Sequence, residues 1–222
     1  MMGKAMVGLA QLVAVMGLLV FAPAGTWRFV EGWVFLLLFA GASLAVTLYL
    51  ARNDPKLLAR RTQAGPVAEH EPRQKLIQLA ASASFLAVLI VPALDRRFGW
   101  SHLPGAVVVA GDDLVAFGFL VVFYVFKENT FTSAVVEVAE GQQVVDTGPY
   151  SVVRHPMYAG ALALVAGIPL ALGSLVGLVT LVPFVAVIVA RLLDEERFLS
   201  DRLAGYDAYC ERTRYRLVPH VW

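Results

Sequence analysis

Five side chains capable of binding or acid–base chemistry flank one long apolar run near the C-terminal end of the sequence. They are Arg154, His155, Tyr158, Glu195 and Glu196. Pro156 disfavours a helical conformation at His155 but suits the first turn of a following helix, so His155 should stand at a helix mouth. The N–H groups of that first turn, beside Arg154, would favour an anionic group such as a carboxylate.

The apolar run 159–190 places these two groups of side chains relative to each other. It is too long for a single helix that crosses a lipid bilayer, which needs ~20 residues. Gly173 and Ser174 in its middle predict a tight turn between two helices. Two helices joined there return their far ends to the same membrane face, so the two groups should meet. A zwitterionic ligand would bridge them, with its carboxylate at the helix mouth, its ammonium or hydroxyl groups on a glutamate, and a cationic centre facing Tyr158.

Four further apolar runs precede this hairpin, at about 5–24, 30–50, 76–94 and 105–126, and each has the length of a membrane-crossing helix. The chain is 59% hydrophobic, with a mean hydropathy of +0.69, more apolar than an ordinary soluble domain. We therefore predict an all-α integral membrane protein of five to six transmembrane helices. Residues 1–128 would form an N-terminal membrane region, and 129–222 a ligand-binding region of loop, helical hairpin and tail helix.

The positions of Lys and Arg predict the orientation. With six crossings and both termini in the cytoplasm, 15 of the 18 Lys and Arg residues lie inside and only Arg28, Arg96 and Arg97 lie outside. The polar groups at the hairpin mouths would then face the cytoplasm. An alternative is that residues 1–24 are a cleaved secretory signal, because Lys4 precedes an apolar core that ends in small residues. A retained helix is favoured, since its removal leaves an odd number of crossings.

Asp112 and Asp113 interrupt the fourth apolar run, where a charge at the bilayer centre costs about 2.5–3.5 kcal/mol. We expect them to cap the start of that helix, and the alternative is a buried functional pair. The single cysteine, Cys210, cannot form an internal disulfide and is expected to be inert. The net charge of +1 argues against a nucleic-acid partner, which needs a concentrated basic surface.

The region after residue 128 resembles the isoprenylcysteine carboxyl methyltransferase family and its relatives among the phospholipid methyltransferases. The residues that carry the resemblance are, in order, Gly148, Pro149, Tyr150, Arg154, His155, Pro156, Met157, Tyr158, Gly160, Glu195, Glu196, Leu199, Tyr206 and Tyr209. Asn129 also has a counterpart in the family. The resemblance covers about residues 129–219, and the first four runs are similar only in being apolar helices.

The resemblance implies a methyltransferase with an S-adenosylmethionine (SAM) site on the cytoplasmic side, reached from within the bilayer by a lipophilic small molecule or a lipidated substrate. It implies no metal. The implied cofactor-binding residues are Tyr150, Arg154, His155, Pro156, Tyr158, Glu195 and Glu196. Between the glutamates and Tyr206 the sequence is one residue shorter than the usual family pattern, so a shifted register that uses Asp194 with Glu195 stays open.

Methyl transfer requires mainly that the acceptor and the methyl group be held close together in a site poor in water. A carboxylate acceptor needs a cation to orient it, and the candidates are Arg191, Arg197 and Arg214, with Arg191 first because it ends the last span. A neutral amine or thiol needs a general base, and Glu195 is the candidate.

Two other functions stay open. The first is an NADPH-dependent enzyme like the sterol reductases, which share a related C-terminal region, and the second is a non-catalytic membrane accessory protein. The sequence has no G-x-G-x-x-G after a strand, so it does not support a doubly wound nucleotide-binding domain.

Overall fold

The computed structural model describes residues 2–61, 72–132 and 141–222, and every regular element in these residues is a helix. The helices are α1 (Met2–Ala24), α2 (Val30–Asn53), α3 (Pro55–Arg61), α4 (Pro72–Phe98), α5 (Gly105–Glu128), α6 (Pro156–Ala171), α7 (Leu181–Arg202) and α8 (Tyr206–Arg212), with the short 3₁₀ helices η1 (Gly148–Ser151) and η2 (Val176–Thr180). The predicted all-α fold is confirmed. The predicted loops 51–75 and 127–157 lie partly outside the described residues.

Among the described residues, five helical segments are long and apolar enough to cross a membrane: α1, α2, α4, α5 and the continuous segment formed by η2 and α7. The helix α6 is apolar but has 16 residues, which extend about 24 Å at 1.5 Å per residue and fall short of the ~30 Å hydrocarbon core. It is nevertheless the first arm of the predicted hairpin.

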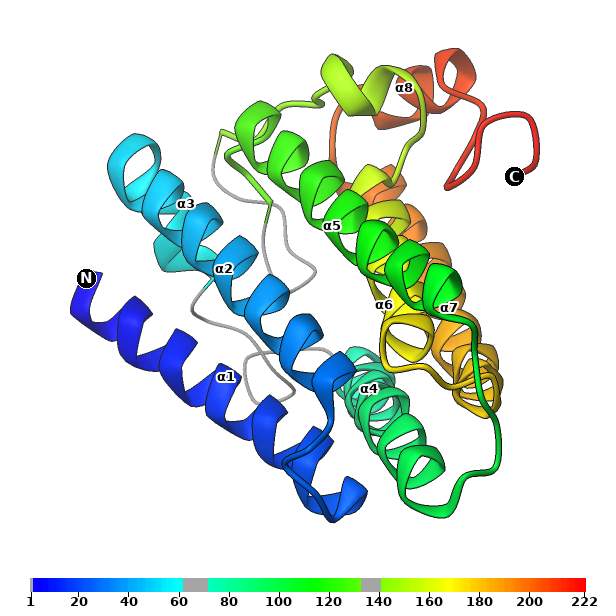
Figure 1. Cartoon of the computed structure of the whole chain (residues 1–222). Coiled ribbons are helices and arrows are strands. Elements are labelled where there is room, and N and C mark those ends of the chain that lie inside the picture. Colours follow the sequence, from blue (N-terminus) through cyan, green and yellow to red (C-terminus); the bar gives the residue numbers. More distant parts are fainter. Residues whose placement is uncertain (1, 62–71, 133–140) are drawn as a thin grey trace.

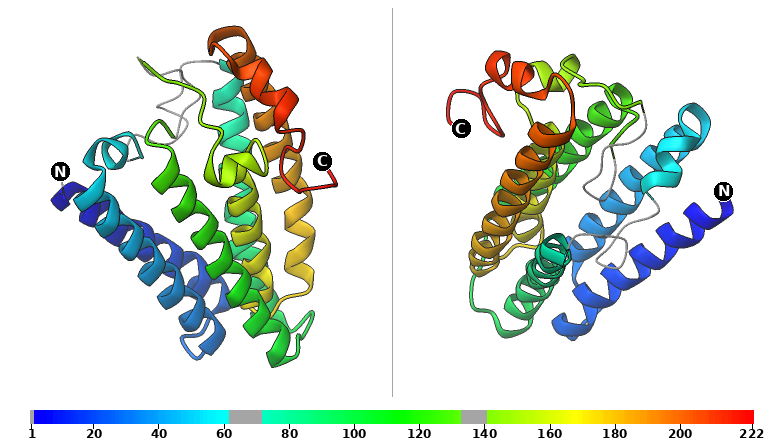
Figure 2. Two further views of the ribbon diagram at one scale, coloured as in Figure 1. Left: turned by 90° about the horizontal axis from the view of Figure 1, so that it is seen from above. Right: turned by 180° about the vertical axis from the view of Figure 1, so that it is seen from behind.

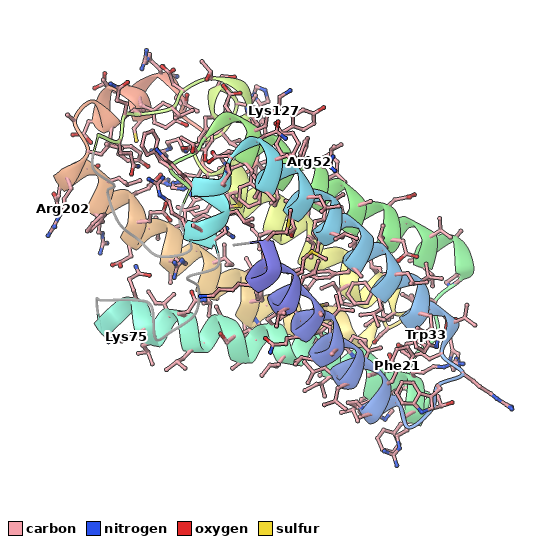
Figure 3. The ribbon with its side chains drawn as sticks, turned by 90° about the vertical axis from the view of Figure 1, so that its left-hand side faces the viewer. Phe21, Trp33, Arg52, Lys75, Lys127 and Arg202 are labelled. Atoms are coloured by element: carbon pink, nitrogen blue, oxygen red, sulfur yellow. The ribbon has the colours of Figure 1, made fainter. Side chains whose placement is uncertain are left out.

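The helices form one bundle whose two ends differ in character. The pair α1 and α2 lies on one side, the group α5, α6 and α7 on the other, and α4 contacts both (Figures 1 and 2). We call the end that carries α8 the α8 end. Toward it lie Arg52, Lys75, Lys127 and Arg202, and toward the opposite end lie Phe21 and Trp33 (Figure 3). Basic residues and interfacial aromatic residues are commonly found at the ends of membrane-crossing helices.

The closest helix pair is α5 with α6, and glycines permit it. A Cβ added at Gly111 would lie 2.3 Å from the backbone nitrogen of Ala171, and one at Gly118 would lie 2.5 Å from that of Leu164. No side chain fits at such distances, so the two backbones touch directly, as small residues allow in membrane helices. This contact fixes α6, and with it the helix mouth at Pro156, against α5.

The turn of the hairpin lies where it was predicted, at the end opposite to α8. Gly173 adopts a positive φ of 72°, which glycine tolerates without strain. Asp95 of α4 accepts hydrogen bonds from the hydroxyl groups of Ser101 and Ser174, and from the Ser101 N–H at 2.7 Å. Ser174 in turn accepts from the N–H of Gly177 at 2.8 Å. This network ties the hairpin turn to α4 and to the loop before α5.

The prediction that Asp112 and Asp113 cap a helix is wrong. The helix α5 begins earlier, at Gly105 after Pro104, whose φ of −58° already suits a helix start. Both aspartates therefore lie inside the helix. Asp113 is exposed, whereas Oδ1 of Asp112 is buried and has no hydrogen-bond partner among the described residues.

Candidate functional site

The mouth of α6 is held in place by the C-terminal tail. His155 is the N-terminal cap residue of α6 and Pro156 is its first residue, as predicted. The N–H of Arg154 donates to the carbonyl of Tyr215 at 2.8 Å, and the N–H of His155 donates to that of Arg216 at 3.0 Å. These two bonds satisfy backbone donors that precede the helix and bring the tail against the site.

Glu196 lies at the centre of a compact ion cluster. Its Oε1 lies 3.2 Å from Nη1 of Arg154 and 3.2 Å from Nε2 of His155, and its Oε2 accepts from Nε of Arg216 at 2.8 Å. The side chains of Glu196, Arg154 and His155 are only 11%, 10% and 5% exposed. Glu196 thus joins α7, the α6 mouth and the tail, and it does not line the adjacent cavity.

Glu195 points to a different set of partners. The hydroxyl of Tyr158 donates to Oε2 of Glu195, and Nε of Arg191 donates to the same hydroxyl at 3.1 Å. Arg191 also donates from Nη1 to the side-chain oxygens of Gln78 at 2.8 Å and Gln74 at 3.3 Å. A continuous polar chain therefore runs from α4 through α7 to α6, and four of its members, Gln78, Arg191, Tyr158 and Glu195, line the cavity.

Asp194 is turned toward α4. It accepts a hydrogen bond from Nε2 of Gln74, and it does not line the cavity among the described residues. Of the three adjacent acidic residues at the end of α7, Glu195 is therefore the one that the fold presents to the cavity.

The cavity has a volume of about 500 Å³, within the range of ligand pockets, roughly 300–1,000 Å³. Its wall changes in character along α7. Glu195 and Arg191 lie toward the α8 end, and Ile188 and Phe184 follow along the helix toward the opposite end. The distance from Glu195 to Phe184 along the helix axis is about 16 Å at 1.5 Å per residue. The cavity therefore suits a ligand, or two ligands, with a polar part and an apolar part.

The described structure brings most of the predicted site residues together. Lining the cavity are Tyr150, Arg154, His155, Pro156, Tyr158, Arg191 and Glu195. Glu196 supports the site from outside the cavity, and Arg197 and Arg214, the alternatives to Arg191, are not part of the wall. The lining residues that the sequence did not point to include Arg61, Gln78, Ser82, Phe85, Phe131, Phe184 and Ile188.

Residues 106–204 match the model of the phospholipid methyltransferase family. We call this matched part of the chain, residues 106–204, the phospholipid methyltransferase segment. The match agrees with the resemblance seen in the motifs around His155 and Glu195. The match extends from α5 almost to the start of α8, so the close α5–α6 pair and the hairpin both fall within it.

A second similarity points to a reductase. The Delta(14)-sterol reductase of Mus musculus is 33% identical over 90 residues, which are 39% of this chain. Those residues are 22% of the reductase, so the similarity covers a small part of that protein.

Residues outside the phospholipid methyltransferase segment complete the site. Arg61 and Gln78 come from α3 and α4, before the segment, and Tyr206, Tyr209 and Arg216 come after it. The segment therefore supplies the helix mouth and the acidic wall, whereas flanking elements close the cavity on the α3 side and on the α8 side.

The phenol of Tyr150 is a neutral part of the wall. Burial raises the pKa of Tyr150 to about 12, although the hydrogen bond that Asn129 donates to it at 3.1 Å acts in the opposite direction. Tyr209 donates its hydroxyl to the carbonyl of Tyr150 at 2.8 Å and so joins α8 to η1. Tyr150 therefore offers a hydroxyl group, not a phenolate, at any physiological pH.

Proposed function

We propose that the protein is an integral membrane methyltransferase that uses SAM and acts on a lipophilic acceptor. The observation that carries the proposal is a cavity, lined mostly by the residues that match the phospholipid methyltransferase family, whose wall changes from a charged end to an apolar end. The charged end would take the polar cofactor, and the apolar end would take the hydrophobic part of the acceptor.

The residues of the charged end fit SAM. The anionic Glu195 beside the Tyr158 ring suits a cationic centre and an ammonium group. The start of α6, with Arg154 and His155 on the wall, suits a carboxylate. Tyr206 and Phe131 offer aromatic surface for a purine ring. We therefore assign cofactor binding to the predicted set without Glu196, which would act by holding Arg154 and His155 in place.

When bound, SAM supplies an electrophilic methyl group. The chain's own contribution is to hold the acceptor atom in line with that group and to exclude water. Arg191, fixed by Gln78 and Tyr158, would orient an acceptor carboxylate, which needs no proton transfer. A neutral amine or thiol acceptor must lose its proton, and the carboxylate of Glu195 would take it.

We also propose that the site and both chain ends face the cytoplasm, because nearly all Lys and Arg residues then lie inside. A topology reporter fused after Trp222 tests this, and a signal from the opposite side would contradict it.

The sterol reductase similarity favours a second candidate, an NADPH-dependent reduction in the same cavity. The two candidates use different cofactors, so a cofactor measurement separates them.

The test of catalysis is the transfer of radiolabelled methyl from SAM to products that partition into organic solvent, using purified protein and a lipid extract. We expect transfer by the wild type and a strong reduction in Glu195→Gln. The matched control is Glu211→Gln, an exposed glutamate of α8, which should behave as wild type. Equal transfer by Glu195→Gln and wild type would contradict the assigned role of Glu195.

A further inference from the structure

Arg61 is a basic residue of the cavity wall that comes from outside the phospholipid methyltransferase segment. It is the last residue of α3, and its guanidinium lies over the Phe126 ring at 5.1 Å from the ring centre. Arginine stacks on aromatic faces in this way, which restricts the direction of its charged group.

The short helix α3 is itself fixed to the rim of the site. Oδ1 of Asp54 accepts from the N–H of Leu57 at 2.9 Å and caps the helix, while Oδ2 accepts from the hydroxyl of Thr130. Arg60 donates from Nη1 to the carbonyl of Thr130 at 2.8 Å. These hydrogen bonds join α3 to the loop after α5 and so hold Arg61 against the cavity.

Arg61 and Arg191 act on the same space. Burial lowers the pKa of Arg61, and the positive charge of Arg191 lowers it further, while Tyr158 and Tyr150 raise it. An arginine keeps its charge under such influences. Besides Arg154 at the α6 mouth, the cavity wall therefore has two guanidinium groups, one from α3 and one from α7, and the apolar positions Phe184 and Ile188 follow Arg191 along α7.

We propose that Arg61 is a specificity-determining residue: with Arg191 it receives the oxyanion head group of the acceptor, which is an acidic amphiphile. This rests on the proposed function. Guanidinium groups bind carboxylate and phosphate oxygens in paired hydrogen bonds, and an apolar tail would extend toward Phe184. Glu195 and the α6 mouth, formed by other elements, remain for the cofactor.

The experiment measures binding of four radiolabelled twelve-carbon amphiphiles to the full chain in nanodiscs, with empty nanodiscs as the reference. Dodecanoate and dodecyl phosphate carry the oxyanion, and dodecylamine and dodecanol do not. We expect the wild type to bind at least one oxyanion about tenfold or more tightly than dodecanol, because hydrogen bonds to charged groups strengthen binding by about that factor or more. The tighter of the two oxyanions identifies the head group.

The variants separate this role from folding and from cofactor binding. Arg61→Gln should lose most of the preference, and Arg61→Lys should keep part of it, while the SAM affinity of both stays that of wild type. Lys56→Gln, which removes an exposed charge from the same helix, should keep the full preference. An unchanged preference in Arg61→Gln, or a loss of SAM affinity in it, would overturn the proposal. Failure of the wild type to bind SAM would instead contradict the proposed function.

Discussion

The two adjacent glutamates of α7 should respond in opposite ways to the same substitution. Glu196 is 11% exposed and holds Arg154, His155 and Arg216 at 3.2, 3.2 and 2.8 Å. Removing one partner of a buried ion pair costs about 3–5 kcal/mol, because it leaves charge buried without compensation. Since Arg216 is 30% exposed and can be solvated, we expect the lower value, about 3 kcal/mol, for Glu196→Gln.

Glu195→Gln should leave stability nearly unchanged, because glutamine can still accept the hydrogen bond from Tyr158. The substitution should instead weaken the binding of SAM. A hydrogen bond to a charged group is worth about 1.5–3 kcal/mol, so the dissociation constant for SAM should rise roughly 10- to 150-fold.

The assay pairs two measurements on each variant. Equilibrium unfolding in mixed micelles gives stability, and calorimetric titration with SAM gives affinity. The expected pattern is reduced stability for Glu196→Gln and reduced affinity for Glu195→Gln. The reverse pattern would place Glu196 against the cofactor and refute the assignment of Glu195 to the cavity wall.

Three further predictions concern the framework. Gly118→Leu should cost about 1–3 kcal/mol or more of stability by overpacking, because a Cβ there lies 2.5 Å from a backbone nitrogen of α6. The control Gly41→Ala, in open space on α2, should instead stabilise the protein by up to about 1 kcal/mol. Unfolding curves that show equal effects of the two substitutions would contradict the close helix contact. Ser174→Ala should cost about 1–3 kcal/mol by removing a donor to Asp95 without changing SAM affinity, since it lies at the opposite end of the bundle; a large change in titrated affinity would show the reasoning wrong. For Tyr150, the folded pKa of about 12 exceeds the ordinary 10.0, so its contribution to stability is complete below pH 10 and is lost as pH rises toward 12; unfolding measured across that window should show a shallower decline in Tyr150→Phe, and identical slopes would oppose this.

Much of the fold follows from local features of the sequence. The first four apolar runs have the length of membrane helices, and each of them lies within one helix of the structure. The hairpin was predictable because its run is too long for one crossing and Gly173 marks its turn. Pro156 located the helix mouth, since proline suits the first turn of a helix and disfavours a helical conformation at the residue before it. These are short-range constraints that a single sequence displays.

The remaining features depend on packing between distant segments. The choice between Glu195 and Glu196 is made by the rotation of α7 against α6 and by Arg216 in the tail, which the run of acidic residues does not reveal. Arg61 reached the cavity because α3 docks on the loop after α5, and the sequence showed only a basic loop there. Asp112 was misplaced because the apolar residues before it continue the helix instead of preceding it.

Titration of the purified protein with SAM, its demethylated product and NADPH in parallel shows which cofactor the cavity binds. We predict saturable binding of SAM and of the product, weakened by Glu195→Gln and by His155→Ala, with no binding of NADPH. Saturable binding of NADPH without binding of SAM would contradict the proposed methyltransferase and favour the reductase.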